Sequence, residues 1–391
     1  MTPIPQPPPR PGRLSRRTLL RAALLTAPLP AVAAATATAA AGVRPRALVF
    51  PADFGAHPDT RTEWWYATGW LADPARPGEP THGFQVTFFR SRTALAQRQP
   101  PHPSAFAARQ LIFAHAALTD LGARRQHHDQ RIAREGFGRA GAALGDTRAT
   151  LGDWHLAREA GADSDTSLYR ARVGSAALGG TLTLVLRTTQ PLLLQGSAGF
   201  SRKGPDPEQA SHYYSQPQLA VEARWQPEGA AAAARTLAGR GWLDHEWSET
   251  LLHPQAVGWD WIGMNLDDGS ALTAFRLRRA DGSMLWAGGS WRRAGQTPPQ
   301  ARAFGPDEVR FTPGRHWSSA ATGARYPVEW QVETPAGRWT VQALLDAQEL
   351  DSRGSTGTVY WEGLSALIGP DGRRAGLGYL EMTGYAGRLA L

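Results

Sequence analysis

Short runs of apolar and β-branched residues, many of them alternating with polar positions, recur along this chain. Residues 83–90 alternate with a period of two, residues 63–71 are rich in tryptophan, and residues 110–118 form an extended apolar run. Such runs, separated by turns rich in Gly, Asp and Pro, predict antiparallel β-strands. Long amphipathic helices are rare, and the best helical windows are residues 129–139 and 229–238. The pattern therefore predicts an all-β fold.

The strand pattern restarts after Gly239. Runs typical of strands follow at residues 241–247, 259–265, 271–278 and 283–291, and further ones continue to residue 383. Asp267-Asp268-Gly269 and Asp281-Gly282 have the residue types of hairpin turns. We therefore expect two β-meanders, a domain of residues 50–238 and a second of residues 239–391, each beginning on a tryptophan-rich strand.

Residues 1–41 have a different composition. Arg16-Arg17 precede a short, alanine-rich apolar run from Ala22 to Ala35 that contains two prolines. Twin arginines before such a run indicate a Tat export signal, and the small residues that follow offer several cleavage sites. We expect residues 1–41 to be a signal peptide and the mature protein to be periplasmic or extracellular. An uncleaved anchor or a basic tail is the alternative.

Charge and cysteine content exclude several classes. Subtracting the five arginines of residues 1–41 from the net charge of +8 leaves +3 for the mature chain, which gives no reason to expect nucleic-acid binding. Lys203 is the single lysine. Because there is no cysteine, disulfides, thiolate metal sites and cysteine nucleophiles are excluded.

The densest chemistry lies in residues 241–248, where Asp244, His245 and Glu246 stand between Trp242 and Trp247. In an extended strand, Trp242, Asp244, Glu246 and Ser248 share one face, and Leu243, His245 and Trp247 share the other. Trp259-Asp260-Trp261 repeats the mixture of aromatic rings and acid.

Four motifs occur in order, at residues 50–58, 62–69, 211–217 and 241–247. Together they resemble the AttH/CrtC family of lipocalin-like proteins, which includes carotenoid 1,2-hydratases and exported relatives labelled predicted hydrolases. The resemblance covers nearly all of residues 50–385. It implies two packed lipocalin-like antiparallel β-barrel domains with an apolar ligand cavity.

Hydration of a carbon–carbon double bond needs an acid that is protonated near neutral pH, support for a carbocation and a held water. Asp244, Glu246 and Asp260 are the candidate acids. The resemblance points to His245 and Trp247 as the residues that match the hydratases' histidine and tryptophan. The tyrosine and aspartate expected on a following strand are absent from residues 271–277.

These arguments give three groups of residues. The predicted catalytic residues are His245, Trp247 and Asp260; the predicted ligand-binding residues are Trp65, Tyr213, Trp259 and Trp261; and the predicted structural polar network comprises Glu63, Asp244 and Glu246. No metal or cofactor is expected. A purely structural role for residues 244–246, at a seam between domains, is the alternative.

Other motifs give weaker evidence of function. His245-Glu246 is not followed by the second histidine of a zinc-protease motif, no G-x-S-x-G occurs, and His127-His128-Asp129 is expected to be a solvated loop. The sequence thus predicts an exported protein that binds a hydrophobic partner, a carotenoid, isoprenoid or lipid, in a β-barrel cavity. The alternatives are a metal-independent hydro-lyase of carotenoid 1,2-hydratase type and an accessory protein of a membrane export or attachment system.

Overall fold

The computed structural model describes residues 42–98, 104–161, 166–229, 233–296 and 300–389. Two large antiparallel sheets and one two-stranded sheet account for the strands in these residues, and the three helices there are single 3-10 turns. The predicted all-β class is therefore confirmed. No helix among the described residues has the length and hydropathy needed to cross a bilayer. The predicted signal peptide, residues 1–41, lies outside the described residues.

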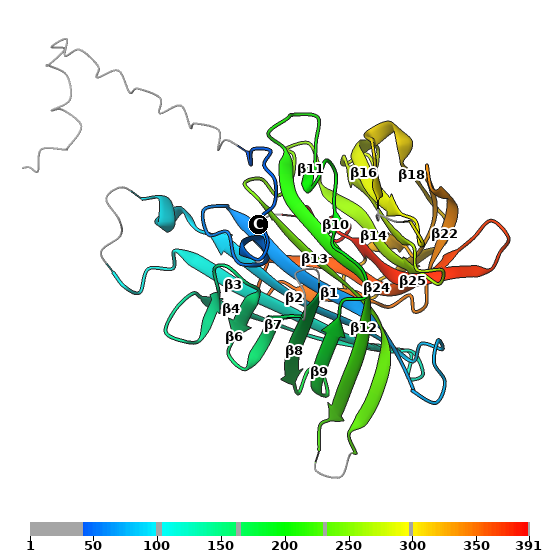
Figure 1. Ribbon diagram of the computed structural model, residues 1–391, viewed down its shortest axis with the longest axis horizontal. Coiled ribbons are helices and arrows are strands. Elements are labelled where there is room, and N and C mark those ends of the chain that lie inside the picture. The colour runs from blue at the N-terminus through cyan, green and yellow to red at the C-terminus, as the bar shows by residue number, and fades with distance from the viewer. Residues whose placement is uncertain (1–41, 99–103, 162–165, 230–232, 297–299, 390–391) are drawn as a thin grey trace, which may run out of the picture. The chain divides into compact units, whose positions relative to one another are not determined.

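The first sheet has 13 strands, which run from blue to green in Figure 1. Its main path follows the order β4-β3-β2-β1-β13-β12-β9-β8-β7-β6-β5, and β10 and β11 both pair with β12. The strands are β1 (Thr62–Ala72), β2 (His82–Arg92), β3 (Gln110–Asp120), β4 (Arg125–Arg134), β5 (Ala140–Ala142), β6 (Arg148–Leu151), β7 (Trp154–Ala160), β8 (Ser167–Ser175), β9 (Gly180–Arg187), β10 (Leu193–Leu194), β11 (Phe200–Arg202), β12 (Ala210–Pro227) and β13 (Arg235–Ser248).

This first sheet curves into a nearly closed barrel. Its edge strand β4 is joined to the opposite end of the sheet by Arg131. The Arg131 guanidinium donates to the carbonyl oxygens of Leu151 and Gly174 at 3.3 and 3.2 Å, and it lies 4.2 Å from the ring centre of Trp154. One side chain therefore ties together strands that share no backbone ladder.

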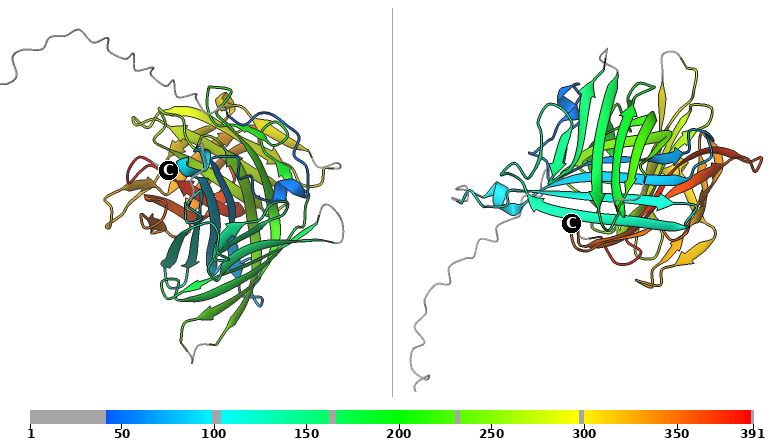
Figure 2. Two further views of the ribbon diagram at one scale, coloured as in Figure 1. Left: turned by 90° about the vertical axis from the view of Figure 1, so that its left-hand side faces the viewer. Right: turned by 90° about the horizontal axis from the view of Figure 1, so that it is seen from below.

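The second sheet has ten strands, in the order β17-β16-β15-β14-β25-β24-β22-β21-β18, with β23 paired to β24. In both views of Figure 2 its yellow to red strands gather to one side of the cyan to green strands of the first sheet, against which they pack. The strands are β14 (Gly258–Leu266), β15 (Ala271–Arg278), β16 (Met284–Arg292), β17 (Ala301–Phe304), β18 (Arg310–Pro313), β21 (Glu329–Thr334), β22 (Gly337–Ala343), β23 (Glu349–Ser352), β24 (Thr358–Ile368) and β25 (Arg374–Met382); β19 (His316–Ser318) and β20 (Arg325–Pro327) form the small sheet.

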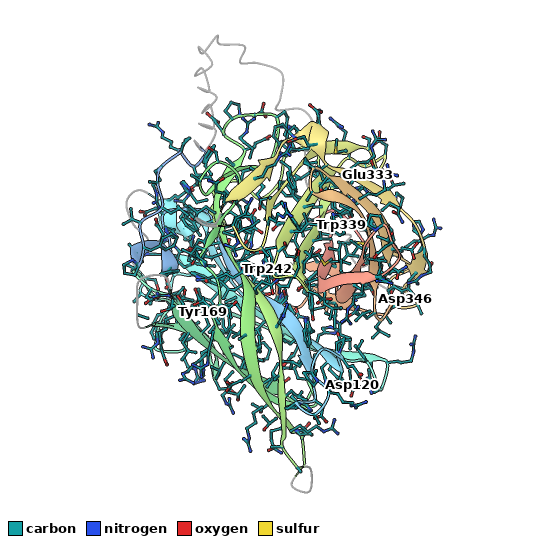
Figure 3. All side chains as sticks on the ribbon, turned by 45° about the vertical axis from the view of Figure 1, so that its right-hand side comes forward. Asp120, Tyr169, Trp242, Glu333, Trp339 and Asp346 are labelled. Carbon is teal, nitrogen blue, oxygen red and sulfur yellow. The ribbon has the colours of Figure 1, made fainter. Side chains whose placement is uncertain are left out.

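Apolar side chains fill three places. One cluster, with Trp65, Phe88 and Leu243, fills the first barrel, and a second, with Trp330 and Trp361, packs on the inner face of the second sheet. A third cluster joins the two sheets and contains Trp242, which Figure 3 labels. Because side chains alternate along a strand, β1 and β13 contribute to the first barrel with one face and to the junction with the other.

The structure differs from the strands and helices that we expected in the middle of the chain. Residues 241–248 do not begin the second sheet, because β13 pairs along its length with β1 and β12 of the first. The change of sheet falls between Ser248 and Gly258, not near residue 238. Residues 129–134 form part of strand β4, and residues 235–238 belong to β13, so the described residues of the two helical windows form no helix. The division into two domains itself stays a prediction.

Candidate functional site

Strand β13 separates two different environments. In the antiparallel register His245 lies opposite Trp65 of β1 and Tyr214 of β12, whereas Glu246 lies opposite Trp64 and Tyr213. Leu243 belongs to the core of the first barrel and Trp242 to the junction between the sheets. The two faces expected from strand alternation are therefore present, and they differ in what surrounds them.

The barrel face holds a closed polar network around Glu63. This carboxylate is fully buried and accepts hydrogen bonds from Arg90 Nε at 2.7 Å, from His57 Nδ1 at 2.7 Å and from His245 Nε2 at 2.9 Å. Burial alone would raise the pKa of Glu63, but the bonds from His245 and His57 and the charge of Arg90 hold it well below its ordinary value. Glu63 is thus ionised and lies at the centre of this hydrogen-bond network.

Aromatic rings enclose this network on both sides. The His57 ring stacks on Trp247 with centroids 3.7 Å apart, and Trp65 stacks on His245 at 4.6 Å. Burial lowers the pKa of His245. His57, Glu63 and His245 are of metal-ligating types with ligand atoms within 4.8 Å of one another, but hydrogen bonds and Arg90 already saturate the Glu63 carboxylate.

Asp260 lies in strand β14 of the second sheet and points away from the junction between the two sheets. Its carboxylate is fully buried and accepts from Arg276 Nε at 2.7 Å and from the Tyr385 hydroxyl at 2.8 Å, and Arg278 Nε lies 3.1 Å away. Strand alternation explains the placement, since Trp259 and Trp261 point to the junction and the residue between them points away. The structure therefore does not bring the three predicted catalytic residues together.

A cavity lies between the two sheets, on the other face of β13. Its volume is about 130 Å³. Three of the four residues predicted to bind a ligand, Tyr213, Trp259 and Trp261, line it, and Trp65 does not. The apolar wall also includes Trp64, Phe89, Phe275, Leu252 and Leu277. The expected cavity inside a barrel is thus replaced by one between the sheets, because apolar side chains fill the first barrel.

Asp244 and Glu246 are buried at the junction of the two sheets, and both line this cavity. Asp244 accepts hydrogen bonds from Tyr213 Oη at 2.9 Å, from Trp242 Nε1 at 2.7 Å and from Ser215 Oγ. Burial, with a smaller contribution from the Glu246 charge, raises the pKa of Asp244 to about 7. Asp244 can therefore exchange a proton near neutral pH.

Glu246 is held differently. It accepts a short hydrogen bond from Ser211 Oγ, and Lys203 Nζ lies 3.0 Å from its carboxylate. The Lys203 ammonium also lies 4.6 Å from the ring centre of Tyr213 and 4.4 Å from that of Phe275. The single lysine of the chain is thus part of the cavity wall and neutralises one of its carboxylates.

Two further acids, Glu362 and Glu381, were missed from the sequence. They face each other across β24 and β25. Burial and the neighbouring Glu381 raise the pKa of Glu362 well above its ordinary value, and burial raises that of Glu381 to about 7. A signal was available: each is a lone acid inside an apolar strand. What the sequence could not show is that both face the same cavity as Asp244 and Glu246 of β13.

His115 connects the two sheets at the edge of the cavity. Its Nδ1 lies 2.8 Å from the Tyr360 hydroxyl and its Nε2 lies 2.9 Å from Ser355 Oγ. Burial lowers the pKa of His115 to about 3, so the ring is neutral near pH 7. His115 therefore adds no positive charge to the cavity, and both of its ring nitrogens are already hydrogen-bonded within the protein.

Comparisons with known proteins agree with this architecture. A family model described as AttH-like matches residues 41–385. The crystal structure of an AttH protein from Nitrosomonas europaea is similar with a TM-score of 0.77 and 48% identity, over 88% of this chain and 98% of that one. Kievitone hydratase from Nectria haematococca is similar with a TM-score of 0.62 and 14% identity, over 87% of this chain and 94% of that one, which shows a shared fold. No curated protein matches the chain.

Proposed function

The chain belongs to the AttH-like family, and from this premise we propose that it binds a hydrophobic small molecule in the cavity between the two sheets. The observation that carries the proposal is the wall of that cavity, in which Trp64, Trp259, Trp261 and Phe275 surround a few fixed polar groups. Ligand sites commonly combine an apolar lining with a small number of well-placed polar side chains. The apolar lining suits contact with an isoprenoid or lipid tail.

The test is to purify the protein, extract it with organic solvent and identify any bound molecule by mass spectrometry. We expect a hydrophobic compound in near-stoichiometric amount, and displacement of the neutral dye Nile red from the emptied protein by the same compound. Leu252→Trp, which adds volume to the cavity wall outside the strands, is expected to lower Nile red affinity. Leu144→Trp, at a position that is 70% exposed, is the matched control. Absence of both a bound compound and a dye site would refute the proposal.

A second candidate, a metal-independent hydro-lyase, is favoured by one observation. Asp244 and Glu381 both have pKa values of about 7 and face the same cavity. In such a reaction a carboxylic acid donates its proton to one carbon of a C=C bond, and aromatic faces stabilise the carbocation by about 0.5–2 kcal/mol. Water then bonds to the other carbon and returns a proton to a carboxylate. This chain shares its fold with a protein named as a hydratase, and that likeness supports the second candidate.

This second candidate is tested by incubating the protein with lycopene and analysing the products for a tertiary alcohol. Product is expected from the unaltered protein and from Asp260→Asn, and loss of product is expected for Asp244→Asn and Glu381→Gln. If Asp260→Asn or His245→Ala alone abolishes product while the cavity variants stay active, the site lies elsewhere.

Export is a separate part of the proposal, and it rests on Arg16-Arg17 and the apolar run that follows. Replacing both arginines with lysine is expected to leave the protein in the cytoplasm. Fractionation of the native host cells measures this directly, and unchanged export of the double variant would contradict a Tat route. A role as an accessory protein of a membrane export or attachment system has only the family resemblance in its favour.

A further inference from the structure

We propose that the cavity between the sheets is specific for an organic cation, an ammonium group carrying an apolar tail. This inference rests on the proposed binding of a hydrophobic ligand and names the class of that ligand. It is carried by the charges that face the cavity, by buried polar atoms that lack a partner, and by the way in which the cavity already holds one ammonium group.

The charges of the cavity are unbalanced. Four carboxyl groups line it, those of Asp244, Glu246, Glu362 and Glu381, whereas Lys203 is the one lysine or arginine among the lining residues that the structure describes. The chain contains 42 lysines and arginines in total, so basic side chains were available. The ion pair between Lys203 and Glu246 leaves three carboxyl groups without a counter-charge in the cavity wall.

Two buried polar atoms there have no hydrogen-bond partner in the described part of the chain. Glu362 is only 1% exposed and its Oε1 makes no hydrogen bond of normal geometry, and neither does the hydroxyl of Tyr66, which is 7% exposed and lies beside the same carboxyl group. Buried polar groups are normally paired, and an unpaired one indicates a missing donor or acceptor. A carboxyl oxygen facing a cavity is completed by an N–H donor, which a protonated amine supplies.

Aromatic rings complete the match to a cation. Lys203 shows how an ammonium group is held here, because its Nζ lies between the faces of Tyr213 and Phe275 beside the Glu246 carboxylate. Trp259 and Trp261 of β14 add aromatic wall next to Glu381. Ring faces attract cations electrostatically, and the attraction grows where water is excluded.

Alkyl probes that share one tail distinguish this from other ligand classes. Octylamine, 1-octanol and octanoate are each titrated against the protein, with displacement of Nile red and isothermal calorimetry as readouts. At pH 8 we expect protonated octylamine to bind about tenfold more tightly than octanol, and octanoate to bind least. An anion would meet the carboxylates of the cavity that are ionised at pH 8, and an alcohol would leave their charge uncompensated.

The pH dependence supplies a second readout. The titratable groups that face the cavity from all packed elements are Asp244, Glu246, Glu362, Glu381, Lys203, His115, Tyr66, Tyr213 and Tyr360. Of these, Asp244 and Glu381 have pKa values of about 7. Octylamine affinity is therefore expected to rise between pH 6 and pH 8 as these carboxyl groups ionise, while octanol affinity stays constant.

Variants locate the effect. Asp244→Asn and Glu381→Gln, which preserve shape and remove carboxyl groups with pKa values of about 7, are each expected to remove most of the roughly tenfold preference for octylamine over octanol at pH 8. Glu222→Gln, on the exposed side of β12, is the matched control and should leave it unchanged. Octylamine and octanol binding with equal affinity, or a preference that survives both variants, would overturn the cation proposal and leave the hydrophobic-ligand proposal standing. If none of the three probes binds, both proposals fail.

Discussion

The same substitution at two buried glutamates is expected to have very different effects. Glu63 and Glu362 are 0% and 1% exposed, and both lie in central strands. Glu63 is ionised and paired with Arg90, whereas the raised pKa of Glu362 keeps it protonated at pH 7. Glu63→Gln therefore removes a charge from a network, and Glu362→Gln exchanges one neutral group for another.

The loss of stability in Glu63→Gln depends on the charged group that stays buried after the substitution. Arg90 is 1% exposed, and its Nε lies 2.7 Å from the Glu63 carboxylate, so Glu63→Gln leaves a guanidinium buried without its counter-charge. Breaking a buried pair on one side costs about 3–5 kcal/mol. His57 and His245 also lose their shared acceptor charge. For Glu362→Gln, we expect a change of less than about 1 kcal/mol, because no charge is lost.

Thermal unfolding of the purified protein at pH 7, followed by circular dichroism, measures the difference. At about 2–4 °C per kcal/mol, Glu63→Gln should lower the melting temperature by about 6–20 °C. Glu362→Gln should change it by less than about 4 °C. The reasoning would be refuted if the two variants melted within a few degrees of each other, since that would mean that both carboxyl groups have the same charge in the folded protein.

Three other variants test the assignments of the site. Burial raises the pKa of Asp244 to about 7, so its stabilising contribution is complete below pH about 4 and is lost as the pH rises through 7. Asp244→Asn should therefore reduce the fall in the free energy of unfolding over this pH range, which urea titration measures. An unchanged dependence on pH would contradict the assignment. Asp260→Asn should cost about 3 kcal/mol by leaving Arg276 and Arg278 unpaired, yet preserve Nile red affinity, because Asp260 points away from the cavity. A Cβ at residue 263 would lie 2.3 Å from Trp261 Cη2, so Gly263→Ala should displace that ring and change Nile red affinity, while Gly122→Ala, whose Cβ meets only an Asp120 oxygen at 3.3 Å, should not.

Much of the fold could be predicted because strand signals are local. Alternation, tryptophan-rich runs and turn residues are properties of a few neighbours, and they indicated the all-β class and most of the strands that surround the site. Residues 125–134 were missed because a strand at a sheet edge with half-buried, largely polar side chains lacks the apolar face that marks a strand. Local signals do not determine which strands pair with one another, and so β13 was assigned to the wrong sheet.

For the candidate site as well, one part could be predicted from the sequence and another part could not. The sequence by itself determined that Asp244 and Glu246 share one face of a strand and His245 and Trp247 the other, because side-chain direction in a strand depends only on parity. Only the tertiary structure decided which face meets a cavity. That depends on β13 pairing with β1, which encloses His245 beside Glu63, and on β24 and β25 bringing Glu362 and Glu381 to the other side. Charge and burial at residues more than a hundred positions apart, which no local pattern records, determine which of these acids are protonated near neutral pH.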